Sequence, residues 1–115
     1  MPERLDPIAA RLGDVLLRRG LTLACAESCT GGWISKVVTD IPGSSAWFDR
    51  GFVTYSNQAK QEMLGVAAAT LENHGAVSEA VVLEMAAGAL ERSCAQVAVA
   101  VSGIAGPGGG VPDRP

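Results

Sequence analysis

The stretch LTLACAESCTGG, from Leu21 to Gly32, decides the fold class of this chain of 115 residues. Its first six residues, Leu21–Ala26, form a short apolar run, which is typical of a buried strand. The polar segment Glu27–Gly32 follows, and the residues from Trp33 to Thr39 predict a short helix. A strand that leads through a glycine-ending loop into a helix is a building unit of α/β sheets.

Strands and helices alternate along the rest of the chain. Two further strands are predicted, one near Gly51–Tyr55 and one at Gln96–Ser102, where QVAVAVS runs directly into GIAGPGGG. Helices are predicted at Pro7–Gly20, at Asn57–Leu64 after a Ser56 cap, at Ala67–His74, and from a Ser78 cap to Ser93. The order predicts one domain, an α/β fold with three α/β/α layers, in which helices pack on both faces of a mostly parallel sheet.

Composition excludes several classes of function. The chain carries 9 basic and 12 acidic residues, a net charge of −3, and its densest basic cluster is Arg18-Arg19, so we expect no binding to bulk nucleic acid. No apolar run reaches the ~20 residues of a membrane span. Three cysteines without a signal peptide favour the cytoplasm. Since no His, Cys and Asp cluster has metal-ligand spacing, we expect no metal and no cofactor.

Two glycine-rich loops each follow a predicted strand. In Glu27–Gly32, main-chain N–H groups can converge on an anion beside the hydroxyls of Ser28 and Thr30. Gly103–Gly110 holds five glycines and a proline after the last strand. Either loop alone could be a plain turn or a flexible tip. Because ligands bind at the carboxyl ends of strands in open α/β sheets, the two loops together predict a shared pocket.

A serine nucleophile with a lysine base is one interpretation of GSSAWFDRGFVTYSNQAK, Gly43–Lys60. The single histidine, His74, precedes a helix-ending glycine and is a poor candidate base. A desolvated Lys60 could replace it, with Tyr55 as an aid, although spacing alone equally allows Lys60 to be a solvated helix residue. Cys29 is an alternative nucleophile without an identifiable base.

The remaining polar candidates have structural interpretations. Glu27 and Asp49 are the carboxylates nearest to the loops, and a capping or salt-bridge role is expected for each. Cys25 alternates with small apolar residues in the first strand, so we expect it in the core.

Four motifs in order over nearly the whole chain resemble one family. AESCTGG at Ala26–Gly32, GSSAWFDRGFVTYSNQAK at Gly43–Lys60, GAVSE at Gly75–Glu79 and SGIAGPGGG at Ser102–Gly110 together resemble the CinA C-terminal family of competence/damage-inducible proteins. Each motif alone would be a weak signal, whereas the ordered set is specific.

The resemblance implies an amidohydrolase without metal or cofactor. Stand-alone members look like nicotinamide mononucleotide deamidases, which form nicotinic acid mononucleotide and ammonia in pyridine-nucleotide salvage. By motif, Ser45 would be the nucleophile, Lys60 its general base, and Tyr55 an assisting residue. The implied substrate-binding residues are Ser28, Thr30, Gly31, Gly32, Ser102 and Gly103. The resemblance also implies a homo-oligomer, dimeric or larger.

Family members continue for several tens of residues beyond the length of this chain, with a strand pair, a final helix and an arginine associated with the site. We therefore expect residues 1–115 to form a single CinA-like domain that is incomplete at its C-terminal end. Two alternatives stay open: a non-catalytic nucleotide-binding or regulatory module that uses the same loops, and a thiol enzyme that uses Cys29.

Overall fold

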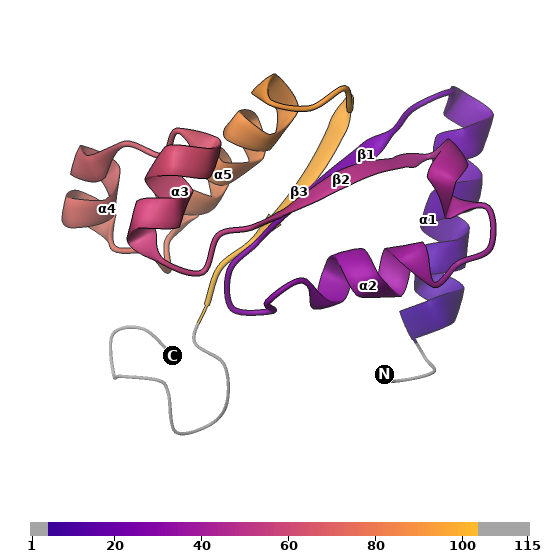
Figure 1. Ribbon diagram of the computed structural model, residues 1–115, viewed down its shortest axis with the longest axis horizontal. Coiled ribbons are helices and arrows are strands. Elements are labelled where there is room, and N and C mark those ends of the chain that lie inside the picture. Colours follow the sequence, from indigo (N-terminus) through magenta and orange to yellow (C-terminus); the bar gives the residue numbers. More distant parts are fainter. Residues whose placement is uncertain (1–4, 104–115) are drawn as a thin grey trace.

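The computed structural model describes residues 5–103, which form a three-stranded parallel sheet between two layers of helices (Figure 1). The strands are β1 (Leu23–Glu27), β2 (Phe48–Val53) and β3 (Val97–Val101), in the order β2-β1-β3. Helices α1 (Leu5–Arg19) and α2 (Trp33–Thr39) lie on one face, and α3 (Asn57–Leu64), α4 (Ala68–His74) and α5 (Glu79–Glu91) on the other. The predicted α/β/α fold is confirmed.

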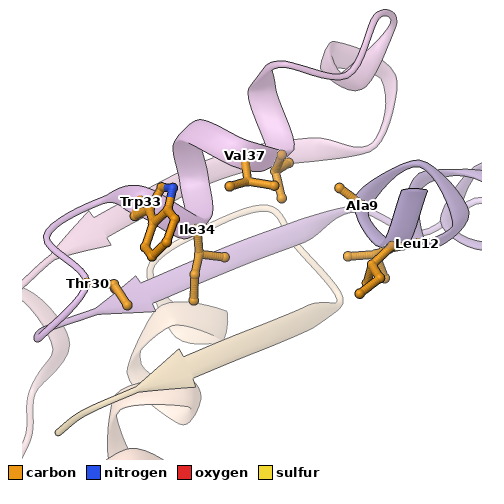
Figure 2. A pocket seen from close by; sticks show the side chains of 8 residues that line it. Ala9, Leu12, Thr30, Trp33, Ile34 and Val37 are labelled. Carbon is orange, nitrogen blue, oxygen red and sulfur yellow. The ribbon is translucent and has the colours of Figure 1, made fainter. Parts of the chain in front are cut away.

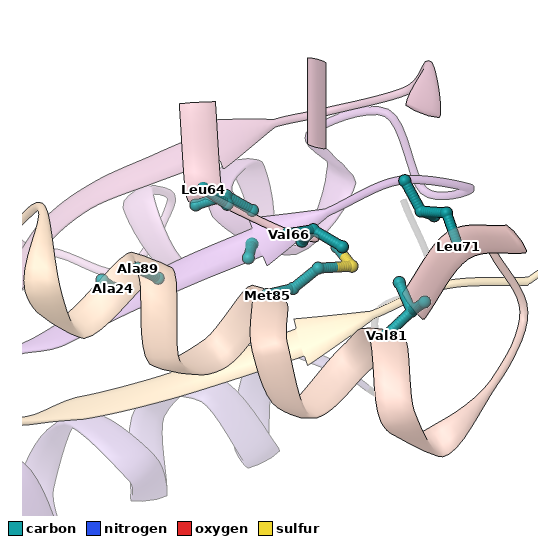
Figure 3. Packing of buried hydrophobic residues seen from close by; sticks show 8 residues of the cluster. Ala24, Leu64, Val66, Leu71, Val81, Met85 and Ala89 are labelled. Carbon is teal, nitrogen blue, oxygen red and sulfur yellow. The ribbon is translucent and has the colours of Figure 1, made fainter. Parts of the chain in front are cut away.

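The central strand β1 contributes side chains to two hydrophobic cores, one on each face of the sheet. All five of its residues are buried, and their side chains alternate between the two faces of the sheet. Ala24 and Ala26 join the cluster of the α3–α5 layer around Leu64 and Met85 (Figure 3). Cys25 joins the cluster of the α1–α2 layer, and the sequence prediction that Cys25 is a core residue is confirmed. Burial raises the pKa of its thiol to about 11, and the neighbouring Glu27 charge adds to the effect.

The helix starts that the sequence predicts are made by serine caps. Ser56 Oγ accepts a hydrogen bond from Ala59 N at 3.0 Å at the start of α3. Ser78 Oγ accepts one from Val81 N at 3.2 Å at the start of α5. Each cap satisfies one of the main-chain donors that a first helical turn leaves unpaired.

The second strand differs from its prediction. It was expected near Gly51–Tyr55, whereas β2 spans Phe48–Val53. The register with β1 shifts so that Asp49 has no direct partner. Its carboxylate accepts from Arg50 Nε at 2.8 Å and Cys94 N at 2.9 Å. The salt bridge expected of Asp49 is present.

No helix among residues 5–103 is long and apolar enough to cross a lipid bilayer.

Candidate active site

Lys60 lies in the first turn of α3 and points inward, with only 1% of its surface exposed. Its Nζ atom lies 3.0 Å from Ser28 Oγ, 2.9 Å from the carbonyl oxygen of Thr54 and 3.2 Å from that of Tyr55. Ser28 directly follows β1, whereas Thr54 and Tyr55 directly follow β2. Because these parallel strands are neighbours, both chain segments leave the sheet at the same edge, where α3 returns Lys60 to meet them.

The burial of Lys60 shifts its protonation equilibrium toward the neutral form. No carboxylate of the described residues forms an ion pair with it, and burial lowers the pKa of its ammonium group, an effect that Cys29 partly opposes. A neutral amine has two N–H donors and one lone pair. The two carbonyl oxygens can accept both N–H bonds, which leaves the lone pair for the Ser28 hydroxyl. Ser28 and Lys60 thus have the geometry of a nucleophile and its base.

Glu27 fixes the loop that carries Ser28. Its carboxylate is fully buried and accepts four hydrogen bonds. Oε1 accepts from Thr30 Oγ1 at 2.7 Å and Ile34 N at 2.8 Å, and Oε2 accepts from Ser35 N at 2.8 Å and Ser35 Oγ at 2.6 Å. Gly32, the residue before α2, supplies no side chain, so Glu27 caps this helix from the adjoining strand. The capping role predicted for Glu27 is confirmed.

The carboxylate of Glu27 stays ionised despite its burial. Burial alone would raise its pKa, but the hydrogen bonds from Ser35, Thr30 and Ile34 outweigh it and hold the pKa below its usual range. The start of α2 was expected to attract an anion of the substrate. In the structure, the protein's own Glu27 occupies that position and also engages the Thr30 hydroxyl.

The two glycine-rich loops begin side by side, as expected. Ser28 N donates to Val101 O at 3.2 Å, and a side chain added at Gly103 would lie 3.4 Å from Cys29 Sγ. Ser102 Oγ donates to Ala76 O at 2.7 Å, in the segment between α4 and α5. The remainder of the second loop, residues 104–110, lies outside the described residues.

The structure does not bring Ser45 to Lys60. Ser45 is exposed in the short 3-10 helix Ser44–Ala46, which precedes β2, whereas Lys60 follows it. A strand of six residues spans roughly 20 Å, so the two side chains lie at opposite edges of the sheet. Tyr55 reaches Lys60 only through its main-chain oxygen, because its side chain is 77% exposed.

Comparison with known proteins identifies the family of this chain. A family model described as the CinA C-terminal domain matches residues 5–115. This chain belongs to the CinA C-terminal domain family. The resemblance that the four sequence motifs indicated is thereby confirmed.

Relatives of this CinA domain include a named enzyme. The nicotinamide-nucleotide amidohydrolase PncC of Escherichia coli K12 is 60% identical over 113 residues, which are 98% of this chain and 68% of that protein. A CinA-like protein of Chlorobaculum tepidum is 61% identical over 102 residues, 89% of this chain and 24% of that protein. The crystal structure of the competence/damage inducible protein CihA from Agrobacterium tumefaciens matches with a TM-score of 0.95 at 53% identity, covering all of this chain and 70% of that one.

An apolar groove of about 300 Å³ lies between α1 and α2 of the CinA domain. Figure 2 shows Ala9 and Leu12 of α1 facing Trp33, Ile34 and Val37 of α2. Neither Ser28 nor Lys60 lines this groove. Its walls supply no charged group for a phosphate.

Sequence reasoning treated Ser28 as a substrate-binding residue and overlooked its contact with Lys60. The signal was available in the predicted topology: Ser28 follows the first strand, and Lys60 lies one helical turn after the second. Neighbouring parallel strands would bring both Ser28 and Lys60 to one edge of the sheet, and would bring Ser45, before the second strand, to the opposite edge.

Gly31 and Gly32 have positive φ angles of 62° and 102° and turn the chain from β1 into α2.

Proposed function

We propose that this CinA domain is an amidohydrolase that converts nicotinamide mononucleotide and water to nicotinic acid mononucleotide and ammonia. The 60% identity to a protein named nicotinamide-nucleotide amidohydrolase supports the reaction. The single observation that carries the mechanism is the 3.0 Å contact between Ser28 Oγ and the buried Lys60 Nζ. We assign Ser28, in place of Ser45, as the nucleophile, and Lys60 as the general base.

In the first half of the reaction, neutral Lys60 accepts the hydroxyl proton of Ser28 while Oγ attacks the carboxamide carbon. The tetrahedral intermediate carries a negative oxygen that needs hydrogen-bond donors. The main-chain N–H groups of Cys29 and Thr30 donate to no acceptor within residues 5–103 and are candidate donors. The Lys60 ammonium then gives its proton to the amide nitrogen as the C–N bond breaks, and ammonia leaves.

In the second half, water hydrolyses the nicotinoyl ester on Ser28. Lys60, neutral again, takes a proton from the water, and the hydroxide oxygen adds to the ester carbon. Collapse of the intermediate breaks the bond to Oγ, which recovers its proton from Lys60. The same three contacts of Nζ serve the neutral and the protonated forms, so the lysine can change its charge without leaving its place.

The substrate-binding roles of Gly31, Gly32, Ser102 and Gly103 belong to this proposal. Ser102 and Gly103 lie beside the first loop, and the glycines permit close approach of a ligand to the main chain. Thr30 would contribute its main-chain N–H, because its hydroxyl is engaged by Glu27. We place the reaction in pyridine-nucleotide salvage in the cytoplasm, and we expect a homo-oligomer.

The test is ammonia release from nicotinamide mononucleotide by the 115-residue chain and by a form extended to the length of its relatives. Ser28→Ala should abolish turnover in any active form, whereas Ser45→Ala should retain kcat within about threefold, because its site is remote from the base. Hydroxylamine added during turnover should trap the ester as a hydroxamate. A fully active Ser28→Ala variant would refute the mechanism.

Two results would favour the other hypotheses. Loss of turnover in Cys29→Ala together with an active Ser28→Ala would indicate a thiol enzyme. Binding of the nucleotide without ammonia release in both forms of the folded protein would indicate a binding or regulatory module.

A further inference from the structure

Glu27 is linked to both members of the Ser28–Lys60 pair through intermediate residues. Its carboxylate holds the loop and helix that follow Ser28, as described above. Its main-chain oxygen accepts from Thr54 N at 2.8 Å, and the carbonyl of Thr54 accepts from Lys60 Nζ at 2.9 Å. We propose that Glu27 is a positioning residue that sets the separation of Ser28 Oγ and Lys60 Nζ. This inference rests on the proposed function, in which that pair performs the chemistry.

The loop between β1 and α2 has few other restraints on its conformation. It runs for five residues from Ser28 to Gly32 and contains two glycines with positive φ. Its first residue is held by the bond from Ser28 N to Val101 O, and two local main-chain bonds, Gly31 N to Ser28 O and Trp33 N to Thr30 O, each of 3.1 Å, shape its turns. The rest of the loop is held by hydrogen bonds to the Glu27 carboxylate, which come from the Thr30 hydroxyl and from the main-chain N–H groups of Ile34 and Ser35 in the first turn of α2. Loss of that acceptor would release the segment that aims Ser28 at Lys60.

The helix that Glu27 caps is itself pressed against β2. A side chain on Gly51 of β2 would lie 2.2 Å from Ser35 Oγ, so the absence of one allows α2 to approach this closely. Ser35 donates to Glu27 through both its main-chain N and its hydroxyl. Glu27 is thus connected to β2 by two routes, through Ser35 on one face of the sheet and through Thr54 at the end of the strand.

Only a carboxylate of this length meets the four donors. A glutamine would place an NH₂ group, itself a donor, where Oε2 now accepts two hydrogen bonds from Ser35. The main-chain N–H of Ser35 cannot reverse its polarity to suit the amide. An aspartate would be shorter by one methylene, about 1.5 Å from the present position of the oxygens, which is too far for a hydrogen bond of normal length.

The decisive experiment compares Glu27→Gln with Glu84→Gln in ammonia release from nicotinamide mononucleotide. Glu84 is a matched control because its carboxylate also receives donors at a helix start, Ala67 N at 2.9 Å and Thr70 Oγ1 at 2.6 Å, away from Ser28 and Lys60. We expect kcat to fall at least tenfold in Glu27→Gln with KM changed less than threefold. Glu84→Gln should leave both constants within twofold of the unaltered protein.

The pH profile separates positioning from a general loss of folded protein. Among the described residues, Cys29 is the titratable group that acts on the charge of Lys60. In Glu27→Gln the contact between Ser28 Oγ and Lys60 Nζ is lost from both protonation states of the lysine, so the acidic limb of kcat/KM should move from its position in the unaltered protein. A variant that is merely less folded would keep the limb in place. A limb that does not move, or a kcat equal to that of Glu84→Gln, would overturn the inference.

Two further measurements keep the inference testable. If Glu27→Gln does not fold, Thr30→Val removes one of the four donors and should lower kcat severalfold, and an unchanged kcat overturns the inference. Ser28 sulfonylation by phenylmethanesulfonyl fluoride, in which fluoride leaves and Lys60 takes the proton, is followed by mass spectrometry and needs no nucleotide. If neither the 115-residue chain nor its extended form releases ammonia, the proposed function fails, while the relative sulfonylation rates of the two glutamine variants still decide the role of Glu27.

Discussion

Replacing Lys60 with methionine tests whether this buried lysine changes its protonation state on folding. Methionine is close to lysine in length and carries no titratable group. In the folded protein, burial lowers the pKa of Lys60, whereas an unfolded lysine titrates near 10.4. The free energy of unfolding of the unaltered protein, minus that of Lys60→Met, should therefore depend on pH in a way that only Lys60 can cause.

The sign and slope of that dependence follow from proton binding. Below the folded pKa of Lys60, both states hold the proton and the difference is constant. Between the folded pKa and about 10.4, the unfolded chain holds a proton that the folded protein lacks, so stability rises with pH. The slope there is about 1.4 kcal/mol per pH unit for one proton. The pH at which the rise begins gives the folded pKa of Lys60.

Denaturant unfolding at a series of pH values measures this difference. Lys36→Met is the control, because the Lys36 side chain is 68% exposed, whereas that of Lys60 is buried. The onset of the rise for Lys60 should coincide with the acidic limb of kcat/KM for ammonia release, since both report the same proton. A flat or falling Lys60 curve would refute the argument that burial prepares this lysine as a base.

Two other substitutions test the packing and the site. Gly88→Ala should destabilise the protein by about 1–3 kcal/mol in denaturant unfolding, because its added Cβ would lie 1.9 Å from the main-chain oxygen of Leu64; a variant as stable as the unaltered protein would show that α3 and α5 do not approach this closely. Tyr55→Phe should keep kcat within about threefold, because the main-chain carbonyl that contacts the lysine is retained; a loss of a hundredfold would instead assign a catalytic role to the phenol.

Most of the fold could be predicted because local signals and burial agree along the chain. Ser56 and Ser78 cap helices where the sequence places them, and the apolar run at β1 is buried on both faces. The start of β2 was missed because Asp49 has low strand propensity, and its end was placed too late because Thr54 and Tyr55 have high strand propensity. That strand forms through its pairing with β1, a contact between segments distant in the sequence.

The candidate active site was predictable in part. Lys60 was identified as a candidate base, and both loops were placed at one edge of the sheet. The partner serine was chosen by motif, and the choice fell on Ser45, which the structure places at the other edge. Strand order and direction decide which serine meets the lysine, and these depend on long-range pairing that a short motif does not encode.

Lys60 and Glu27 are both buried near the same end of β1 but do not contact each other, and this separation has a physical consequence. A carboxylate in contact with Lys60 would favour the ammonium form and raise the pKa of the lysine, which would make it unsuitable as the proposed base. Glu27 is the last residue of β1 and Ser28 directly follows it, yet the Glu27 side chain turns to the opposite face of the sheet from Lys60 and accepts hydrogen bonds from four donors around α2. The carboxylate can therefore organise the site while Lys60 is left with two carbonyl oxygens and a hydroxyl, the set of partners that a neutral amine can satisfy in full.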